Sequence, residues 1–170
     1  MSADFVTNEE IVQAARRRLA QGPWDYLVGA SESETTMRRN RLAFDRIALR
    51  PRVLVNVSEV DPSTNFLGHN LRIPVMLAPV GSLQVLDPEG GAAVTRAAGK
   101  FGTIHVVSSV TQPSLEEISA SADSTKVFQL YIHGDWEWTK EMIDRARQPV
   151  IGRSVLPSIQ LSTAVGNVHC

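Results

Sequence analysis

The sequence predicts an α/β fold built from parallel βα units, because short apolar runs alternate with helical patterns in its second half. The apolar runs cover 75–79, 104–109 and 126–132, and the helical patterns cover 88–102, 114–122 and 135–148. Runs that are apolar throughout are typical of strands buried on both faces of a parallel sheet. Three such units in line indicate an α/β barrel or a doubly wound sheet. The sequence has no GxGxxG motif, which disfavours a dinucleotide-binding sheet.

The composition is that of a globular domain with little charge bias. The chain has 170 residues, 43% of them hydrophobic, which is enough for one domain with a sizeable core. A net charge of -1 argues against a nucleic-acid-binding protein, which would need a strong basic excess or stripe. The lone cysteine, Cys170, predicts neither an internal disulfide nor a cysteine metal site, and no metal site is expected. No apolar run reaches the roughly 18 residues of a membrane span, and the N-terminus lacks signal-peptide features, so we expect a cytoplasmic protein.

The first helical pattern covers residues 7–21. Thr7 and Glu10 have the spacing of a capping box, and an apolar stripe follows at helical spacing. The Gly22-Pro23 pair is expected to end this helix, since both residues interrupt helical backbone.

A second helical pattern covers 31–47, with Ser31 and Glu34 as its expected capping box. Residues 48–74 are rich in β-branched side chains but are broken by prolines and turn signals. We expect this segment to form loops and short, peripheral strands.

The helices of the βα units carry terminal signals of their own. Pro88 suits the first turn of its helix, and Gly102 suits the C-terminal cap. Ser114 and Glu117 again have the spacing of a capping box.

Polar and small residues follow each predicted strand, at 78–82, 108–112 and 129–135. Ligands of α/β folds bind at these carboxyl ends. Gln129 and Tyr131 lie two positions apart on a strand and therefore share a face. They are either a ligand-facing pair or a buried, hydrogen-bonded pair.

Four segments of the chain carry a family resemblance. They are WDYLVGASESETTMRRNRLAFDRIALRPRVLVNVS, LGHNLRIPVMLAPVGSLQ, PEGGAAVTRAAGKFGTIHVVSS and FQLYIHGD. In this order and spacing, over about residues 7–148, the chain resembles the N-terminal part of the FMN-dependent 2-hydroxy acid oxidase and dehydrogenase family. That family includes glycolate oxidase, lactate dehydrogenase flavoproteins and mandelate dehydrogenase.

The resemblance implies the N-terminal portion of a (β/α)8 TIM barrel, with about three βα units and an incomplete barrel. It divides the chain into a helical and loop segment at 1–72, the first three units of an FMN-binding barrel at 73–148, and an aberrant tail at 149–170. It also implies a small 2-hydroxy acid as substrate and FMN as cofactor. Members of the family are often homo-oligomers.

The resemblance assigns roles to residues at the strand ends. The implied flavin contacts are Pro79, Val80, Gly81, Ser108 and Gln129. Tyr131 would bind the substrate hydroxyl, and Tyr26 the substrate carboxylate. Val80 and Val110 depart from the family, which has Thr and, in plant oxidases, Trp there. These departures bear on the substrate more than on the flavin.

No catalytic residue is assigned. The family takes its catalytic Arg, Lys and His from strands 4 to 6, beyond the three units recognised here. His105, inside an apolar run, is interpreted as a core histidine, and His133 as a loop residue near the strand end. Trp136 and Trp138 are interpreted as packing or interface residues, and Gly90-Gly91 as a helix-packing pair rather than a phosphate loop.

The tail at 149–170 lacks the periodicity of the rest of the chain. If translation slipped by one base near Gln148, one consistent set of synonymous codons converts the tail to AGYRSVCFTVDTAVYGRRERAL. That sequence matches the family's fourth strand and the arginine after it. We therefore hypothesise a frameshift at about codon 148. The chain would then be a non-catalytic fragment or a module that associates with a full-length homologue.

Overall fold

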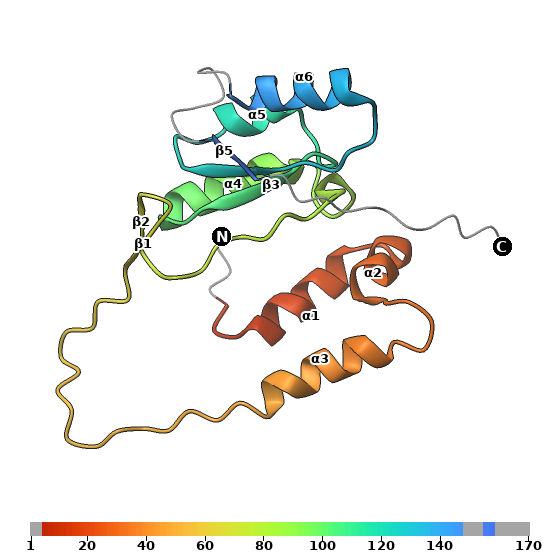
Figure 1. Ribbon diagram of the computed structural model, residues 1–170. Helices are drawn as coiled ribbons and strands as arrows, with labels where there is room; N and C mark the ends of the chain where they lie inside the picture. The colour runs from red at the N-terminus through yellow and green to blue at the C-terminus, as the bar shows by residue number, and fades with distance from the viewer. Residues whose placement is uncertain (1–4, 148–154, 159–170) are drawn as a thin grey trace. The chain divides into compact units, whose positions relative to one another are not determined.

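The computed structural model describes residues 5–147 and 155–158, and the chain divides into two compact units, Met1–Val60 and Asp61–Cys170 (Figure 1). The first unit holds three helices, and the second holds a hairpin, a parallel sheet and the helices that cover it.

The first unit contains α1 (Asn8–Arg18), α2 (Gln21–Val28) and α3 (Thr35–Asp45). The capping box of α1 is confirmed: the Glu10 amide donates to Thr7 Oγ1, and the Thr7 amide donates to Glu10 Oε2, both at 3.3 Å. Two amides that the helix cannot satisfy internally are thereby paired.

Two sequence predictions in this unit are wrong. Gly22-Pro23 does not interrupt the helical region: α1 ends at Arg18, and the pair lies in the first turn of α2, where proline's missing amide costs nothing. Ser31 does not cap α3. Glu34 occupies the cap position in the left-handed region (φ 57), and its Oε1 accepts from the Ala30 amide at 3.2 Å.

The second unit opens with the short peripheral strands predicted for 48–74. β1 (Thr64–Phe66) pairs antiparallel with β2 (His69–Leu71). Leu67 and Gly68 between them both have positive φ, as a two-residue hairpin turn requires.

The parallel sheet consists of β3 (His105–Ser108), β4 (Lys126–Gln129) and β5 (Val155–Ser158), in that order. Ser108 is level with Gln129, and Gln129 with Ser158. The apolar run at 75–79 is shorter than predicted as a strand, because only Leu77 forms a parallel bridge, to His105.

β5 is a finding that the sequence reading missed, since it lies inside the tail at 149–170 that was interpreted as aberrant. Parallel pairing uses backbone groups, so the free edge of β4 accepts a strand without a family-like side-chain pattern. The rest of the tail, including Cys170, lies outside the described residues.

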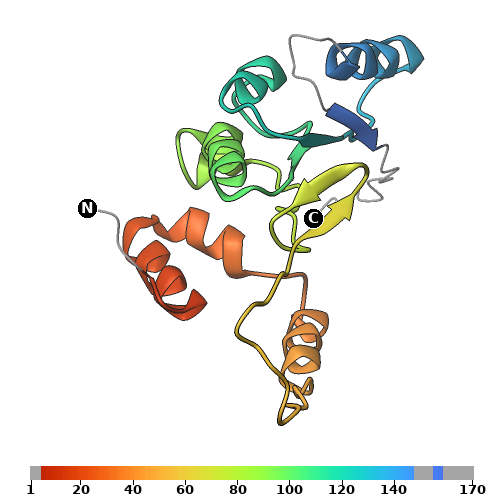
Figure 2. The same cartoon turned by 90° about the vertical axis from the view of Figure 1, so that its left-hand side faces the viewer.

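The helices of the second unit follow the strands as predicted. A short 3₁₀ helix (Leu83–Val85) precedes α4 (Gly90–Phe101), and α5 (Leu115–Ala120) and α6 (Trp136–Arg147) come after β3 and β4. Figure 2 shows α4, α5 and α6 following one another along one side of the strands. This is the arrangement of an incomplete β/α barrel.

Helix ends in this unit mostly follow the predicted signals. Gly102 caps α4 with φ 87, and the capping box of Ser114 and Glu117 is present at the start of α5. Pro88 is not in the first turn of α4, which begins at Gly90 after a cap at Glu89.

The N-terminal glycines of α4 are there for packing, as predicted. A Cβ on Gly90 would lie 2.1 Å from the Gln112 carbonyl oxygen. The Gly91 amide donates to that same oxygen at 2.8 Å. The pair therefore lets the loop after β3 contact the start of the helix directly.

The core lies on both faces of the sheet. On the helix side, Val107 and Phe128 pack with residues of α5 and α6. On the other side, Val127 packs with Leu71 and Ile104. Because strand side chains alternate, Ser108 and Gln129 lie on the same face as Val127, away from the helices.

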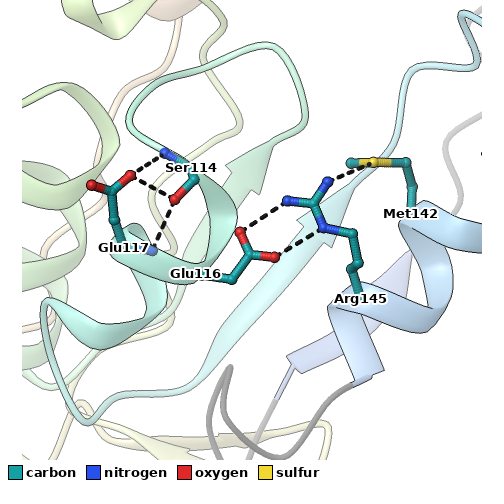
Figure 3. A network of polar contacts seen from close by, with 5 residues as sticks. All are labelled: Ser114, Glu116, Glu117, Met142 and Arg145. Atoms are coloured by element: carbon teal, nitrogen blue, oxygen red, sulfur yellow. Dashed lines mark hydrogen bonds and ion pairs between the residues drawn. The ribbon is translucent and has the colours of Figure 1, made fainter.

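An ion pair joins α5 to α6 above the helix-side core (Figure 3). Arg145 donates from Nε and Nη2 to the two carboxylate oxygens of Glu116, each at 2.9 Å. The Arg145 bond holds the pKa of Glu116 below its usual range. Both side chains are partly exposed, so the pair contributes orientation more than stability.

Candidate functional site at the strand ends

Two polar side chains lie level with each other at the carboxyl ends of β3 and β4. Ser108 is 3% exposed and Gln129 is 2% exposed, and the two are register partners. Polar groups so deeply buried are uncommon unless they are paired. Their burial at this end of a parallel sheet marks the position where ligands of such folds bind.

Gln129 carries the clearest sign of a missing partner. Its Oε1 is buried, and among the described residues no donor reaches it. Leaving an amide oxygen unpaired in the interior costs about 1–3 kcal/mol. An oxygen in this position is suited to accept a hydrogen bond from a ligand N–H.

The loop after β3 is held close to the loop at 79–82. The Val110 amide donates to Ser108 Oγ at 3.4 Å, and the Ser82 amide donates to the Val110 carbonyl at 3.0 Å. A Cβ on Gly81 would lie 2.8 Å from Val110 Cγ2, so glycine permits this approach. The structure thus brings the 79–81 segment beside the strand end that carries Ser108.

Tyr131 follows Gln129 by two residues and is half-buried. Its amide donates to Ser109 Oγ at 3.0 Å. Its ring centroid lies 6.0 Å from that of His133, which lies 6.2 Å from that of Trp138. His133 is therefore a loop residue beside the site, as predicted.

The two tryptophans of α6 differ. Trp138 packs against the helix-side core, whereas Trp136 is 69% exposed. The packing interpretation is thus confirmed for Trp138.

Tyr26 belongs to the other unit of the chain. It lies on α2 in the first unit and is 67% exposed, while the other predicted site residues belong to the second unit. Its assignment to a substrate carboxylate stays a prediction.

His105 is a core histidine, as predicted, and is not part of the site. It lies at the amino end of β3, where its Nδ1 is 2.8 Å from Thr95 Oγ1. Burial first, and the nearby charge of Lys126 second, lower the pKa of His105 to about 4.

Lys126, the register partner of His105 on β4, was not predicted as a structural residue from the sequence. Its Nζ donates to the carbonyls of Ala122 and Ser124 at 2.7 and 2.8 Å, and burial lowers its pKa. It ties the loop after α5 to the start of β4. A lysine opening an apolar run was the one available sign of such a bond.

Among the residues that the structure describes, no group of three His, Cys, Asp or Glu side chains is placed to hold a metal ion. No helix in that part of the chain is both long and apolar enough to cross a bilayer.

The fold and the strand ends together define part of a β/α barrel with a ligand-facing carboxyl end. The family described as FMN-dependent dehydrogenase matches residues 15–156, and the chain belongs to that family. FMN is the cofactor of the family. The predicted family, fold class and cofactor are thereby confirmed.

Individual relatives agree with the family. Glycolate oxidase 3 of Oryza sativa subsp. indica is 38% identical over 144 residues, covering 84% of this chain and 39% of the relative. A peroxisomal (S)-2-hydroxy-acid oxidase, GLO4, of the same plant is 36% identical over 141 residues, covering 83% and 38%. Among solved structures, mandelate oxidase superposes with a TM-score of 0.81 at 29% identity, covering 91% of this chain and 44% of that one. The chain thus spans less than half the length of the relatives that it matches.

Proposed function

We propose that this chain supplies the first strand ends of a flavin site in an enzyme that oxidises the CH–OH of a small 2-hydroxy acid to a 2-oxo acid. The observation that carries the proposal is the buried Oε1 of Gln129, level with Ser108, which no donor among the described residues reaches. The family and its relatives support it, since their names describe FMN-dependent dehydrogenases and 2-hydroxy acid oxidases.

The residues at the strand ends fit a flavin. Gln129 Oε1 would accept from the N–H on the pyrimidine edge of the ring, and the Ser108 hydroxyl would bond the same ring system. The segment Pro79, Val80 and Gly81 would lie alongside the ring, where small side chains allow close approach. When bound, FMN accepts the two electrons that leave the substrate.

The substrate would be held by phenols. Tyr131, two residues after the end of β4, would hydrogen-bond the substrate hydroxyl, and Tyr26 would bond its carboxylate. Val80 and Val110, which are both partly exposed, would shape the space for the substituent on the α-carbon. Two aliphatic side chains there favour an apolar substituent.

We assign no described residue as the base that takes the hydroxyl proton. Such a base works best with a pKa near neutrality. Burial lowers the pKa of His105 to about 4, and this side chain lies at the opposite end of its strand. Because the family resemblance takes the base from a strand beyond the three βα units recognised here, we propose that the chain by itself is non-catalytic.

We further propose that the tail at 149–170 is the product of a frameshift at about codon 148. The support is the strand-4 motif hidden in the neighbouring frame of residues 149–170. Sequencing the gene decides this point. If no single-base change near codon 148 opens a longer family-like frame, the proposal is wrong.

The flavin role is tested by titrating the purified chain with FMN and following the quenching of flavin fluorescence. Gln129→Leu should weaken binding about tenfold, as loss of one buried hydrogen bond does. Gln13→Leu on α1 is the matched control, because Gln13 bonds only Glu9 in the described structure. Equal affinity of the wild-type chain and Gln129→Leu would contradict the role of Gln129.

Turnover separates the remaining alternatives. Oxidation of glycolate, lactate or mandelate by the purified chain would refute its non-catalytic character. A colourless chain that pairs with a co-expressed full-length homologue, and stays monomeric without it, would favour the predicted module.

A further inference from the structure

Ser109 extends the β3–β4 ladder by one residue in an unusual way. In a parallel ladder, a residue donates its amide to one neighbour on the facing strand and accepts from the residue two further along. The Ser109 amide does donate to the Gln129 carbonyl at 2.9 Å. The returning bond from the Tyr131 amide goes to Ser109 Oγ at 3.0 Å, not to the Ser109 carbonyl.

The substitution of a hydroxyl for a carbonyl has a local cause. The chain leaves β3 after Ser108 and turns at Ser109 and Val110. This turn carries the Val110 carbonyl to the Ser82 amide, at 3.0 Å. The backbone can therefore bend toward the 79–82 loop while the Ser109 side chain keeps the ladder closed.

The two hydrogen bonds of Ser109 bind the Gln129 carbonyl and the Tyr131 amide, on either side of Leu130. Leu130 is buried in the helix-side core, which fixes the strand from the other face. Gln129, immediately before it, ends β4 with its side chain on the opposite face, and Tyr131 follows immediately after it. Their directions thus depend on backbone that Ser109 and the core hold from two sides.

We propose that Ser109 is a positioning residue that sets the placement of Gln129 and Tyr131 in the flavin and substrate site. The inference rests on the proposed function for the roles of those two residues. The two hydrogen bonds that Ser109 makes to the backbone at Gln129 and Tyr131, the Ser109 clamp, are a feature of the fold itself. The clamp requires an oxygen on Cβ, which serine and threonine have and alanine lacks.

The test compares Ser109→Ala and Ser109→Thr with the wild-type chain. The exchange rate of the Tyr131 amide with solvent, measured by NMR, should rise about five- to tenfold in Ser109→Ala, because its acceptor is lost. FMN affinity should fall by a similar factor. Ser109→Thr should restore both, since its hydroxyl occupies the same place.

A matched control lies at the opposite end of the sheet. Ser124 precedes β4, and its buried Oγ has no partner among the described residues. Ser124→Ala removes a hydroxyl and should leave both the Tyr131 amide and FMN affinity unchanged. The amide of Val107, in the ladder itself, reports whether any variant loses the sheet.

Each outcome decides a separate point. Unchanged Tyr131 exchange in Ser109→Ala overturns the clamp. Faster exchange with unchanged FMN affinity overturns the positioning role while keeping the clamp. If the wild-type chain binds no FMN, the proposed flavin role of this chain fails and the positioning role fails with it, whereas Tyr131 exchange still reports on the clamp.

Discussion

Each of the two units of the chain is stabilised internally in a different way. In Met1–Val60, none of the three helices buries a residue, and large apolar side chains such as Phe44 and Leu49 are exposed. In the second unit, strands and helices enclose two clusters of buried apolar residues. The first unit therefore depends on local signals, whereas the second depends on contacts between distant segments.

The difference explains why similar motifs have unequal consequences. A helix stabilised mainly by caps and neighbouring side chains is marginal when it is short, because forming its first turn is costly. A helix that also packs on a sheet gains the burial of its apolar face. Four paired changes, from the largest expected effect to the smallest, test whether the units differ in this way.

Phe128→Ala should have the largest effect. Phe128 is among the largest fully buried side chains of the second unit, and its loss should lower the free energy of unfolding by about 3–5 kcal/mol. Phe44→Ala in the first unit removes a ring that is 75% exposed and should cost less than about 0.5 kcal/mol. Urea unfolding followed by NMR signals of each unit measures both. Similar losses for the two variants would mean that the first unit has a core of comparable weight.

Acid should weaken the second unit selectively. The pKa of His105 is lowered from 6.5 to about 4, so between these values the unfolded chain binds a proton that the folded chain does not. Stability is therefore complete above pH 6.5 and is lost as the pH falls toward 4, by up to about 3 kcal/mol. All four histidines lie at position 69 or later, so the first unit lacks this term.

Urea unfolding at pH 7.5 and at pH 4.5 measures the acid effect. His105→Gln keeps a polar side chain opposite Thr95 but does not titrate, so it should remove most of the pH dependence in this window. An unchanged slope in that variant would place the effect on other groups.

A glycine in each unit gives changes of opposite sign. Gly90 has φ 50, and a Cβ there would meet the Gln112 carbonyl oxygen, so Gly90→Ala should cost about 2–3 kcal/mol. Gly22 in α2 has nothing within 4 Å of its Cβ position, so Gly22→Ala should be neutral or stabilise α2 by up to about 1 kcal/mol. Thermal unfolding distinguishes the two. A stabilised Gly90→Ala would show that the loop at Gln112 adapts freely.

The two capping boxes give the smallest and most direct comparison. Ser114→Ala should cost about 1 kcal/mol in the cooperative unfolding of the second unit, because α5 packs on the sheet. Thr7→Ala removes the same kind of bond from α1 but should only increase fraying of its first turn. Amide exchange along each helix measures the effects. Loss of the whole first unit in Thr7→Ala would contradict its local character.

The parts of the fold that the sequence predicted are those that depend on near neighbours. The capping boxes at Thr7 and Ser114 link residues three positions apart, and Gly102 ends α4 through its own backbone freedom. The apolar runs of β3 and β4 are read from composition alone. The flavin and substrate residues came from the family resemblance. The structure gathers six of them in the second unit, and their roles stay predictions.

The left-handed cap at Glu34 is a local departure, since its side chain bonds the Ala30 amide four residues away. Two other departures depend on distant segments. β5 forms at the edge of β4 within the tail at 149–170. Leu77 makes one bridge where a full strand was expected. Each of these two depends on what the neighbouring segment offers, and such neighbours are not visible in a local pattern.

The sequence by itself determined the βα alternation and the residue types at the strand ends, because these follow from periodicity and from short motifs. The family came from a resemblance that extends over about residues 7–148. The tertiary structure decided which of the strand-end residues meet. Two features exist only once β3 and β4 are in register: the bond from the Tyr131 amide to Ser109, 22 residues away, and the buried Gln129 Oε1 that no donor in the described part of the chain reaches. Register fixes which backbone groups face each other, and the register is set only when the sheet packs against its neighbours.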